Sequence, residues 1–102
     1  MKEAYQKAHK FIKYLQEKGL HISAAYIFGS YAKGTANDNS DIDICIISPA
    51  FGKDYFAEMI QLRKIALEID SRIEPVPFSY QDLEDKYNTL AVEVRKFGRI
   101  LS

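Results

Sequence analysis

The sequence AAYIFGSYAKGTANDNSDIDICII, residues 24–47, decides the fold. Its two apolar ends predict buried strands. Between them lie a Gly-Ser pair at residues 29–30 and an Asp-Ile-Asp triplet at residues 41–43. Because the pair follows the first strand and the triplet opens the second, the strands are expected to bring a tight turn and paired carboxylates to one place.

The flanking sequence predicts helices around these strands. Ala4, Ala8 and Phe11 recur at helical spacing. Pro75 and Pro77 lack a backbone donor, which suits an edge strand. The expected elements are a helix over residues 3–18, a strand over 22–28, a short helix over 30–33, a strand over 41–48, a helix capped by Asp54, an edge strand over 72–78, a helical turn over 79–83, a final helix over 90–97 and a tail over 99–101.

This alternation predicts an α/β (α+β) fold in which helices cover a sheet. The link between the first two strands, residues 29–40, is only about as long as the minimum for a parallel crossover, so a mixed sheet is at least as well supported as a parallel one. A chain of 102 residues is expected to form a single domain over 1–102. A second substrate would then be held by a partner or by a second copy in a homo-oligomer.

Composition narrows the function classes. The 14 basic and 14 acidic residues cancel, which argues against a protein that grips long nucleic acid. No apolar run has the length of a membrane span, and charges at Lys2 and Glu3 argue against a signal peptide. We therefore expect a cytoplasmic protein without membrane contact. The single cysteine, Cys45, is flanked by isoleucines and is interpreted as a buried thiol.

The central residues suggest a phosphate and metal site. Asp41 and Asp43 are two residues apart on a strand and share one face. Two adjacent anions favour a bound cation, and Mg²⁺ typically takes one or two carboxylates together with substrate phosphates. Gly29 permits close approach of the backbone to a ligand, and Ser30 offers a hydroxyl and an N–H. The alternative is that the acids form a solvated turn and the Gly-Ser pair a simple reversal.

Three other motifs do not fit. A P-loop requires Lys-Ser or Lys-Thr after its last glycine, whereas Thr35-Ala36 follows Gly34. A Rossmann fingerprint requires three glycines. An EF-hand loop requires a central glycine and a closing glutamate, which no frame here supplies.

The pattern Gly29-Ser30, ten residues, then Asp41-Ile42-Asp43 resembles the nucleotidyltransferase superfamily to which DNA polymerase β belongs. Spacing and size are most similar to the minimal nucleotidyltransferases, the MNT or MntA-like proteins, usually encoded beside a HEPN-domain partner. The resemblance implies a three-stranded mixed sheet with flanking helices. It also implies transfer of a nucleoside monophosphate from a nucleoside triphosphate, with release of pyrophosphate.

In that superfamily a third carboxylate from a later strand completes the metal site, and Glu74 is the matching candidate. The resemblance thus implies that Asp41, Asp43 and Glu74 are catalytic and bind Mg²⁺ or Mn²⁺. An alternative is that Glu74 is an exposed edge residue paired with Arg72.

The resemblance also implies that Gly29 and Ser30 hold the nucleotide phosphates, and Lys33 is within reach of a phosphate as a second-tier candidate. Arg63 and Lys64 are interpreted as solvated surface residues.

The leading functional hypothesis, by resemblance, is an antitoxin that transfers AMP from ATP to a tyrosine of a HEPN toxin, which is AMPylation. One alternative is a non-catalytic module that masks its partner. Another is a small-molecule nucleotidyltransferase similar to those that modify aminoglycosides.

Overall fold

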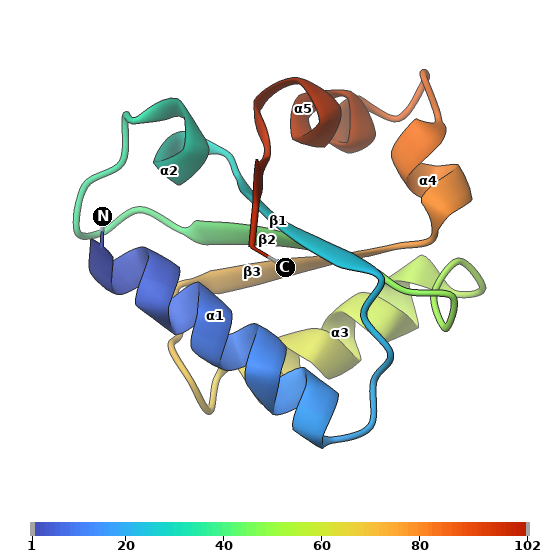
Figure 1. The fold of residues 1–102 in the computed structure, drawn as a ribbon, viewed down its shortest axis with the longest axis horizontal. Coiled ribbons are helices and arrows are strands. Elements are labelled where there is room, and N and C mark those ends of the chain that lie inside the picture. The colour runs from blue at the N-terminus through green and yellow to red at the C-terminus, as the bar shows by residue number, and fades with distance from the viewer. Residues whose placement is uncertain (1, 102) are drawn as a thin grey trace.

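The computed structural model describes residues 2–101 and contains a four-stranded sheet flanked by helices (Figure 1). Within these residues no helix is both long and apolar enough to span a bilayer. The elements are, in chain order, α1 Lys2–Glu17, β1 Ala24–Phe28, α2 Ser30–Lys33, β2 Ile42–Ile47, α3 Tyr55–Ala66, β3 Ile73–Phe78, α4 Tyr80–Glu84, α5 Thr89–Phe97 and β4 Arg99–Ile100.

The sheet is mixed, and the strands lie in the order β3-β2-β1-β4. β1 and β2 are antiparallel, whereas β2 and β3 are parallel and are joined through α3. The expected α/β fold with a mixed sheet and β3 at its edge is therefore confirmed. The link over residues 29–40 makes an antiparallel return, in keeping with its short length.

The expectation of three strands is wrong, because the predicted tail contains a fourth. Arg99 and Ile100 pair with Ile27 and Tyr26 of β1 in antiparallel register. Two residues are too few to show a strand period in the sequence. β4 forms because β1 has an open edge beside the end of α5, and that proximity arises only in the folded chain.

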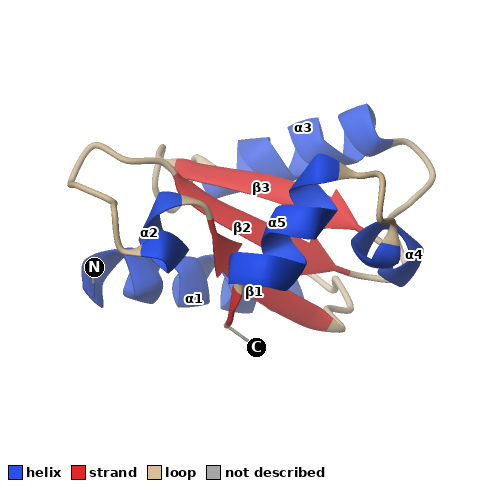
Figure 2. Ribbon diagram, turned by 90° about the horizontal axis from the view of Figure 1, so that it is seen from above, coloured by secondary structure: helices blue, strands red, loops and turns tan. Residues whose placement is uncertain are grey.

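Two apolar cores lie on the two faces of the sheet, with α1 and α3 on one side and α4 and α5 on the other (Figures 1 and 2). Phe11 and Leu15 of α1 are buried on the first side. Cys45 is fully buried on the second side, where burial raises the pKa of its thiol to about 12. The interpretation of Cys45 as a core thiol is confirmed.

The helix caps follow the predicted chemistry. The Asp54 side chain accepts a hydrogen bond from the Ala57 amide at the start of α3. Ser79 and Asp82 form a reciprocal capping box at the start of α4. The final helix begins at Thr89 because Asn88 caps it, one residue earlier than the apolar pattern predicts.

The sequence of β3 limits hydrogen bonding at its free edge, the edge that faces away from β2. The carbonyls of Arg72 and Phe78 accept hydrogen bonds from the backbone amides of Ile42, which begins β2, and Ser48, which directly follows it. Neighbouring residues of a strand direct their backbone groups to opposite sides, so Pro75 and Pro77, which have the other parity, face away from β2. Neither proline has an N–H to expose at the free edge.

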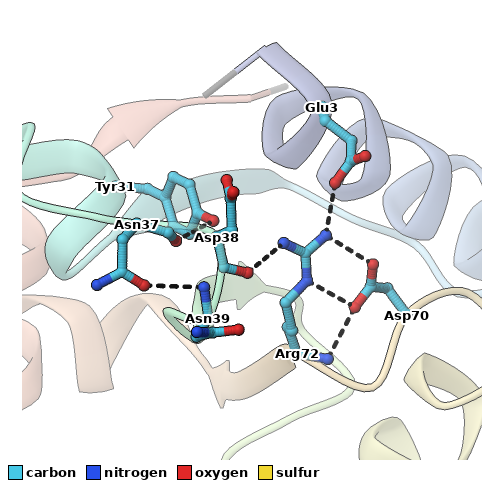
Figure 3. Close-up of polar contacts among 7 residues, drawn as sticks. All are labelled: Glu3, Tyr31, Asn37, Asp38, Asn39, Asp70 and Arg72. Carbon is cyan, nitrogen blue, oxygen red and sulfur yellow. Dashed lines mark hydrogen bonds and ion pairs between the residues drawn. The ribbon is translucent and has the colours of Figure 1, made fainter.

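Arg72, which directly precedes β3, connects three segments of the chain (Figure 3). Its Nε and Nη2 donate to the two carboxylate oxygens of Asp70 at 3.0 and 2.9 Å, and Nη2 also donates to Glu3 Oε1 at 2.8 Å. Its Nη1 donates to the carbonyl of Asp38 at 3.1 Å. Arg72 thus ties α1 and the start of β3 to the loop that leads into β2.

The Asp70–Arg72 contact predicts a pH-dependent loss of stability for Asp70→Asn. Hydrogen bonds from Arg72 lower the pKa of Asp70 from 3.8 to about 2. A lowered pKa adds stability above pH 3.8, and this stability is lost as the pH falls through about 2. We expect Asp70→Asn to lower the free energy of unfolding by about 1–2 kcal/mol at pH 6.

Urea unfolding of wild type and variant at pH 6 and pH 3 measures this effect. The difference between them should shrink at pH 3. Asp85→Asn, at an exposed position directly after α4, serves as the matched control. An equal difference at both pH values would contradict an ionic origin.

Candidate active site

The paired aspartates lie where β2 begins. Asp41 is exposed just before the strand, Ile42 is buried, and Asp43 is half-buried on the same face as Asp41. In the sheet, Asp43 is the register partner of Phe28 at the end of β1 and of Glu74 near the start of β3. The fold therefore places Asp43 between the Gly-Ser turn and Glu74.

The backbone of Gly29 lies directly against this carboxylate. Its backbone has φ 70° and ψ −147°, a conformation that essentially only glycine adopts. A Cβ built on Gly29 would lie 2.2 Å from Asp43 Oδ2. The absence of a side chain at residue 29 thus lets the backbone at the start of α2 pack against the Asp43 carboxylate.

The loop between the two halves of the motif is held by its own side chains (Figure 3). The Tyr31 hydroxyl donates to the backbone carbonyl of Asn37 at 3.1 Å. The backbone N–H of Asn39 donates to the side-chain Oδ1 of Asn37 at 2.8 Å. Tyr31 itself is buried. Together with the hydrogen bond from Arg72 to the backbone carbonyl of Asp38, these contacts hold the loop that connects α2 to Asp41.

Negative charge accumulates around Asp43. Burial, followed by the charges of Asp41, Glu74 and Glu93, raises the pKa of Asp43 from 3.8 to about 6. Glu93 belongs to α5 and is fifty residues from Asp43 in the chain. No local pattern in the sequence marks Glu93 as part of this site.

Glu74 extends from β3 beside Asp43, but its ion pair is with α3. Its Oε1 is 3.6 Å from Nη2 of Arg63, and both side chains are partly exposed. Nη1 of Arg63 also donates to the carbonyls of Ser71 and Ile73 on the outer side of β3. The alternative pairing of Glu74 with Arg72 is wrong, because Arg72 binds Asp70 and Glu3. The interpretation of Arg63 as a solvated residue is also wrong.

The donor chemistry of the three acids suits a hard cation. Carboxylate oxygens are the ligands that Mg²⁺ prefers. Burial first and neighbouring negative charges second raise the pKa of Asp43, and a bound cation would offset those charges. Across residues 2–101, however, no three His, Cys, Asp or Glu side chains converge closely enough to hold a metal ion as arranged. Asp41, Asp43 and Glu74 are neighbours whose carboxylates are not gathered around one point.

Lys33 lies at the end of α2, with its ammonium group engaged by α5. Its Nζ is 2.7 Å from Glu93 Oε1 and 5.0 Å from the centre of the Phe97 ring. The Nε of Arg99 adds a 3.1 Å hydrogen bond to the Ala32 carbonyl. The C-terminal segment therefore holds α2 and occupies the one lysine of that helix.

The geometry unites a glycine-serine turn, a contacting Asp-x-Asp pair and a nearby third acid, and the sequence profile of the nucleotidyltransferase domain matches residues 8–98. The chain belongs to this family. The predicted resemblance to minimal nucleotidyltransferases is confirmed by the relatives that follow.

One relative of this nucleotidyltransferase domain is the protein adenylyltransferase MntA of Shewanella oneidensis. The two are 33% identical over 93 residues, which is 91% of this chain. The chain spans 63% of the length of that relative.

Solved structures agree with this relationship. A toxin–antitoxin structure with AMP-PNP has a TM-score of 0.66 at 30% identity. The match covers 92% of this chain and 72% of the chain in that structure. The toxin–antitoxin MntA-HepT has a TM-score of 0.62 at 26% identity and covers 100% and 72%. A protein from Sulfolobus solfataricus shares the fold, with a TM-score of 0.70 at 19% identity over 96% and 78%.

Proposed function

We propose that this nucleotidyltransferase domain transfers AMP from ATP to a tyrosine hydroxyl of a HEPN-domain toxin and thereby acts as its antitoxin. The observation that carries the proposal is the packing of the Gly29 backbone against the Asp43 carboxylate. In the proposal, the Gly29-Ser30 turn would bind phosphate and the adjacent Asp43 would bind metal, and phosphoryl transfer depends mainly on such positioning and on charge neutralisation. The similarity to an adenylyltransferase and to a toxin–antitoxin structure with AMP-PNP supports the choice of AMP and of partner.

Asp41, Asp43 and Glu74 are the residues that would hold Mg²⁺ or Mn²⁺. When bound, the metal would neutralise phosphate charge and make the acceptor hydroxyl more acidic. Ser30 would bind phosphate oxygens through its hydroxyl and backbone N–H, and Gly29 leaves room for them. The acceptor oxygen bonds to the α-phosphorus while the bridging bond to the β-phosphate breaks, so pyrophosphate leaves and the hydroxyl proton passes to solvent.

The arrangement of the three acids has a consequence for Glu74. To join the two aspartates, its carboxylate must leave Arg63, from which it is 3.6 Å away. The pair is partly exposed, and such pairs contribute only about 0–1 kcal/mol. Nucleotide and metal binding can readily supply this amount. We propose that the active arrangement forms in this way, in a cytoplasmic complex with the partner.

Incubation with labelled ATP, Mg²⁺ or Mn²⁺ and the partner tests the proposal. The partner should become labelled, and replacing its tyrosines one at a time should identify the acceptor. A matched reaction with labelled GTP tests the choice of base. Absence of label on the partner under every metal condition would contradict the proposed transfer.

A second candidate function is neutralisation by binding alone. It is favoured by the Arg63–Glu74 pair, which holds the third acid apart from the other two. In that case Asp41→Asn with Asp43→Asn would bind the partner and neutralise it as well as wild type. If transfer is the mechanism, the double variant should bind the partner and fail to neutralise it.

A further inference from the structure

The contact between Lys33 and Glu93 joins the phosphate side of the site to the C-terminal helix. Lys33 is three residues after Ser30 in α2, so the two side chains lie on the same side of that helix. The Lys33 ammonium is therefore close enough to serve a phosphate bound at Ser30. In this structure it instead contacts Glu93 at 2.7 Å and lies over Phe97.

The Lys33–Glu93 ion pair is exposed enough for a bound phosphate to compete with Glu93 for the Lys33 ammonium group. The Lys33 and Glu93 side chains are 38% and 31% exposed, so solvent and phosphate can both reach them. An ion pair with this exposure contributes little to stability, so either partner can exchange it for another contact. A triphosphate carries several negative charges and competes directly with a single carboxylate for the same ammonium group.

Glu93 also acts on the site as a negative charge. Its carboxylate is 2.7 Å from the Lys33 ammonium at the end of α2, the short helix that begins directly after Gly29. While Lys33 is bound to Glu93, the ammonium neutralises this acid. When Lys33 moves to a phosphate, Glu93 becomes an uncompensated anion beside the nucleotide.

We propose that Glu93 is a positioning residue that holds Lys33 away from the phosphate position, so that the Lys33–Glu93 pair limits the affinity of the site for a nucleoside triphosphate. Binding of the triphosphate transfers Lys33 from Glu93 to a phosphate oxygen. This inference rests on the proposed function for its ligand. It adds a residue that lies outside the Gly-Ser and Asp-x-Asp motifs and that no pattern in the sequence marks.

A double-mutant cycle on the full chain tests the proposal, with ATP binding in Mg²⁺ measured by calorimetry. Glu93→Gln should lower the Kd for ATP by about threefold to fivefold, which corresponds to breaking an exposed pair. Lys33→Met should raise the Kd by a similar factor. In the Lys33→Met background, Glu93→Gln should lower the Kd by a clearly smaller factor than in wild type, because it then relieves only the direct repulsion between Glu93 and the nucleotide and releases no ammonium group. Glu84→Gln on α4, an exposed position, is the matched control.

A charge swap separates this role from a purely structural one. Lys33→Glu combined with Glu93→Lys can restore an ion pair between α2 and α5, so thermal stability should match wild type. The Kd for ATP should nevertheless rise at least as much as in Lys33→Met, because α2 now presents a negative charge. Recovery of both stability and affinity by the swap would overturn the proposal.

The remaining outcomes are also decisive. An equal effect of Glu93→Gln in both backgrounds would show that Glu93 acts as a distant charge and not through Lys33, which overturns the proposal. Wild-type ATP binding that Glu93→Gln leaves unchanged or weakens overturns it as well, and does so without affecting the proposed transfer. Failure of wild type to bind ATP would overturn both, whereas normal coupling without labelling of a partner would overturn only the proposed transfer.

Discussion

Asp43→Asn is expected to lower nucleotidyl transfer by about 10³-fold while making the metal-free protein more stable at neutral pH. The loss of transfer follows from removing a ligand charge whose effect on phosphoryl transfer is several kcal/mol. The gain in stability follows from the crowding of Asp43 by burial and by Asp41, Glu74 and Glu93. A neutral amide of similar shape relieves this repulsion.

The pH dependence has a definite sign. In the metal-free protein the pKa of Asp43 is raised from 3.8 to about 6, so the protonated form is favoured by folding. The associated stability is complete below pH 3.8 and is lost as the pH rises through 6. In EDTA, Asp43→Asn should therefore unfold at a higher temperature than wild type at pH 7.5, and the two should converge near pH 4.

Thermal unfolding and partner labelling, measured on the same samples, check both effects. Asp38→Asn is the matched control, because Asp38 is exposed in the loop before Asp41 and contributes its backbone carbonyl to Arg72. Mg²⁺ should stabilise wild type and this control more than Asp43→Asn. A destabilised Asp43→Asn protein at pH 7.5 in EDTA would contradict the electrostatic interpretation.

Gly29→Ala should have the second large effect, on the geometry of the site. The added methyl group would lie 2.2 Å from Asp43 Oδ2, and the backbone at φ 70° and ψ −147° is strained for any residue with a Cβ. Either the carboxylate or the turn must move. We expect transfer to fall by about 10²-fold or more, because small displacements of positioned groups are that costly, and stability to fall by about 1–3 kcal/mol.

Gly34→Ala separates backbone strain from collision with the carboxylate. Gly34 ends α2 with φ 77°, yet a Cβ there would meet no atom within 4 Å. It should cost about 1 kcal/mol of stability and retain most of the transfer activity. Labelling rates and unfolding curves for both variants provide the comparison. Equal losses of activity in the two would show that strain alone is responsible and that the Gly29 contact is not special.

The sequence predicts well those features that depend on residues close together in the chain. The apolar runs at the two ends of residues 24–47 predict the strands there, and Asp54 and Ser79 predict helix starts that the structure confirms. The two prolines marked an edge strand, and β3 is one. Gly29 and Asp43 were expected to meet because each lies at the end of a strand, and the antiparallel pairing of β1 and β2 brings them into contact. The catalytic roles of the three acids and the phosphate roles of Gly29 and Ser30 remain predictions.

The features that the sequence does not predict depend on pairings between distant segments. Lys33 and Glu93 are sixty residues apart, and each lies on a helix surface where a charged residue is ordinarily solvated. Arg63 meets Glu74 only because α3 packs along the outer side of β3. β4 exists because α5 ends beside an open strand. In each case the local pattern is compatible with several partners, and the packed fold selects one.

The prolines of β3 also bear on the behaviour of the protein at high concentration. With 14 basic and 14 acidic residues, the chain has a formal net charge of +0 at pH 7, so long-range repulsion does little to keep molecules apart. An open strand edge in such a protein would invite edge-to-edge strand pairing between molecules and hence aggregation. Pro75 and Pro77 contribute no backbone N–H donor to this edge, and Arg63 binds the Ile73 carbonyl, so β3 offers few groups with which a strand of another molecule could pair. This edge thus provides a solubility safeguard that the balanced charge does not.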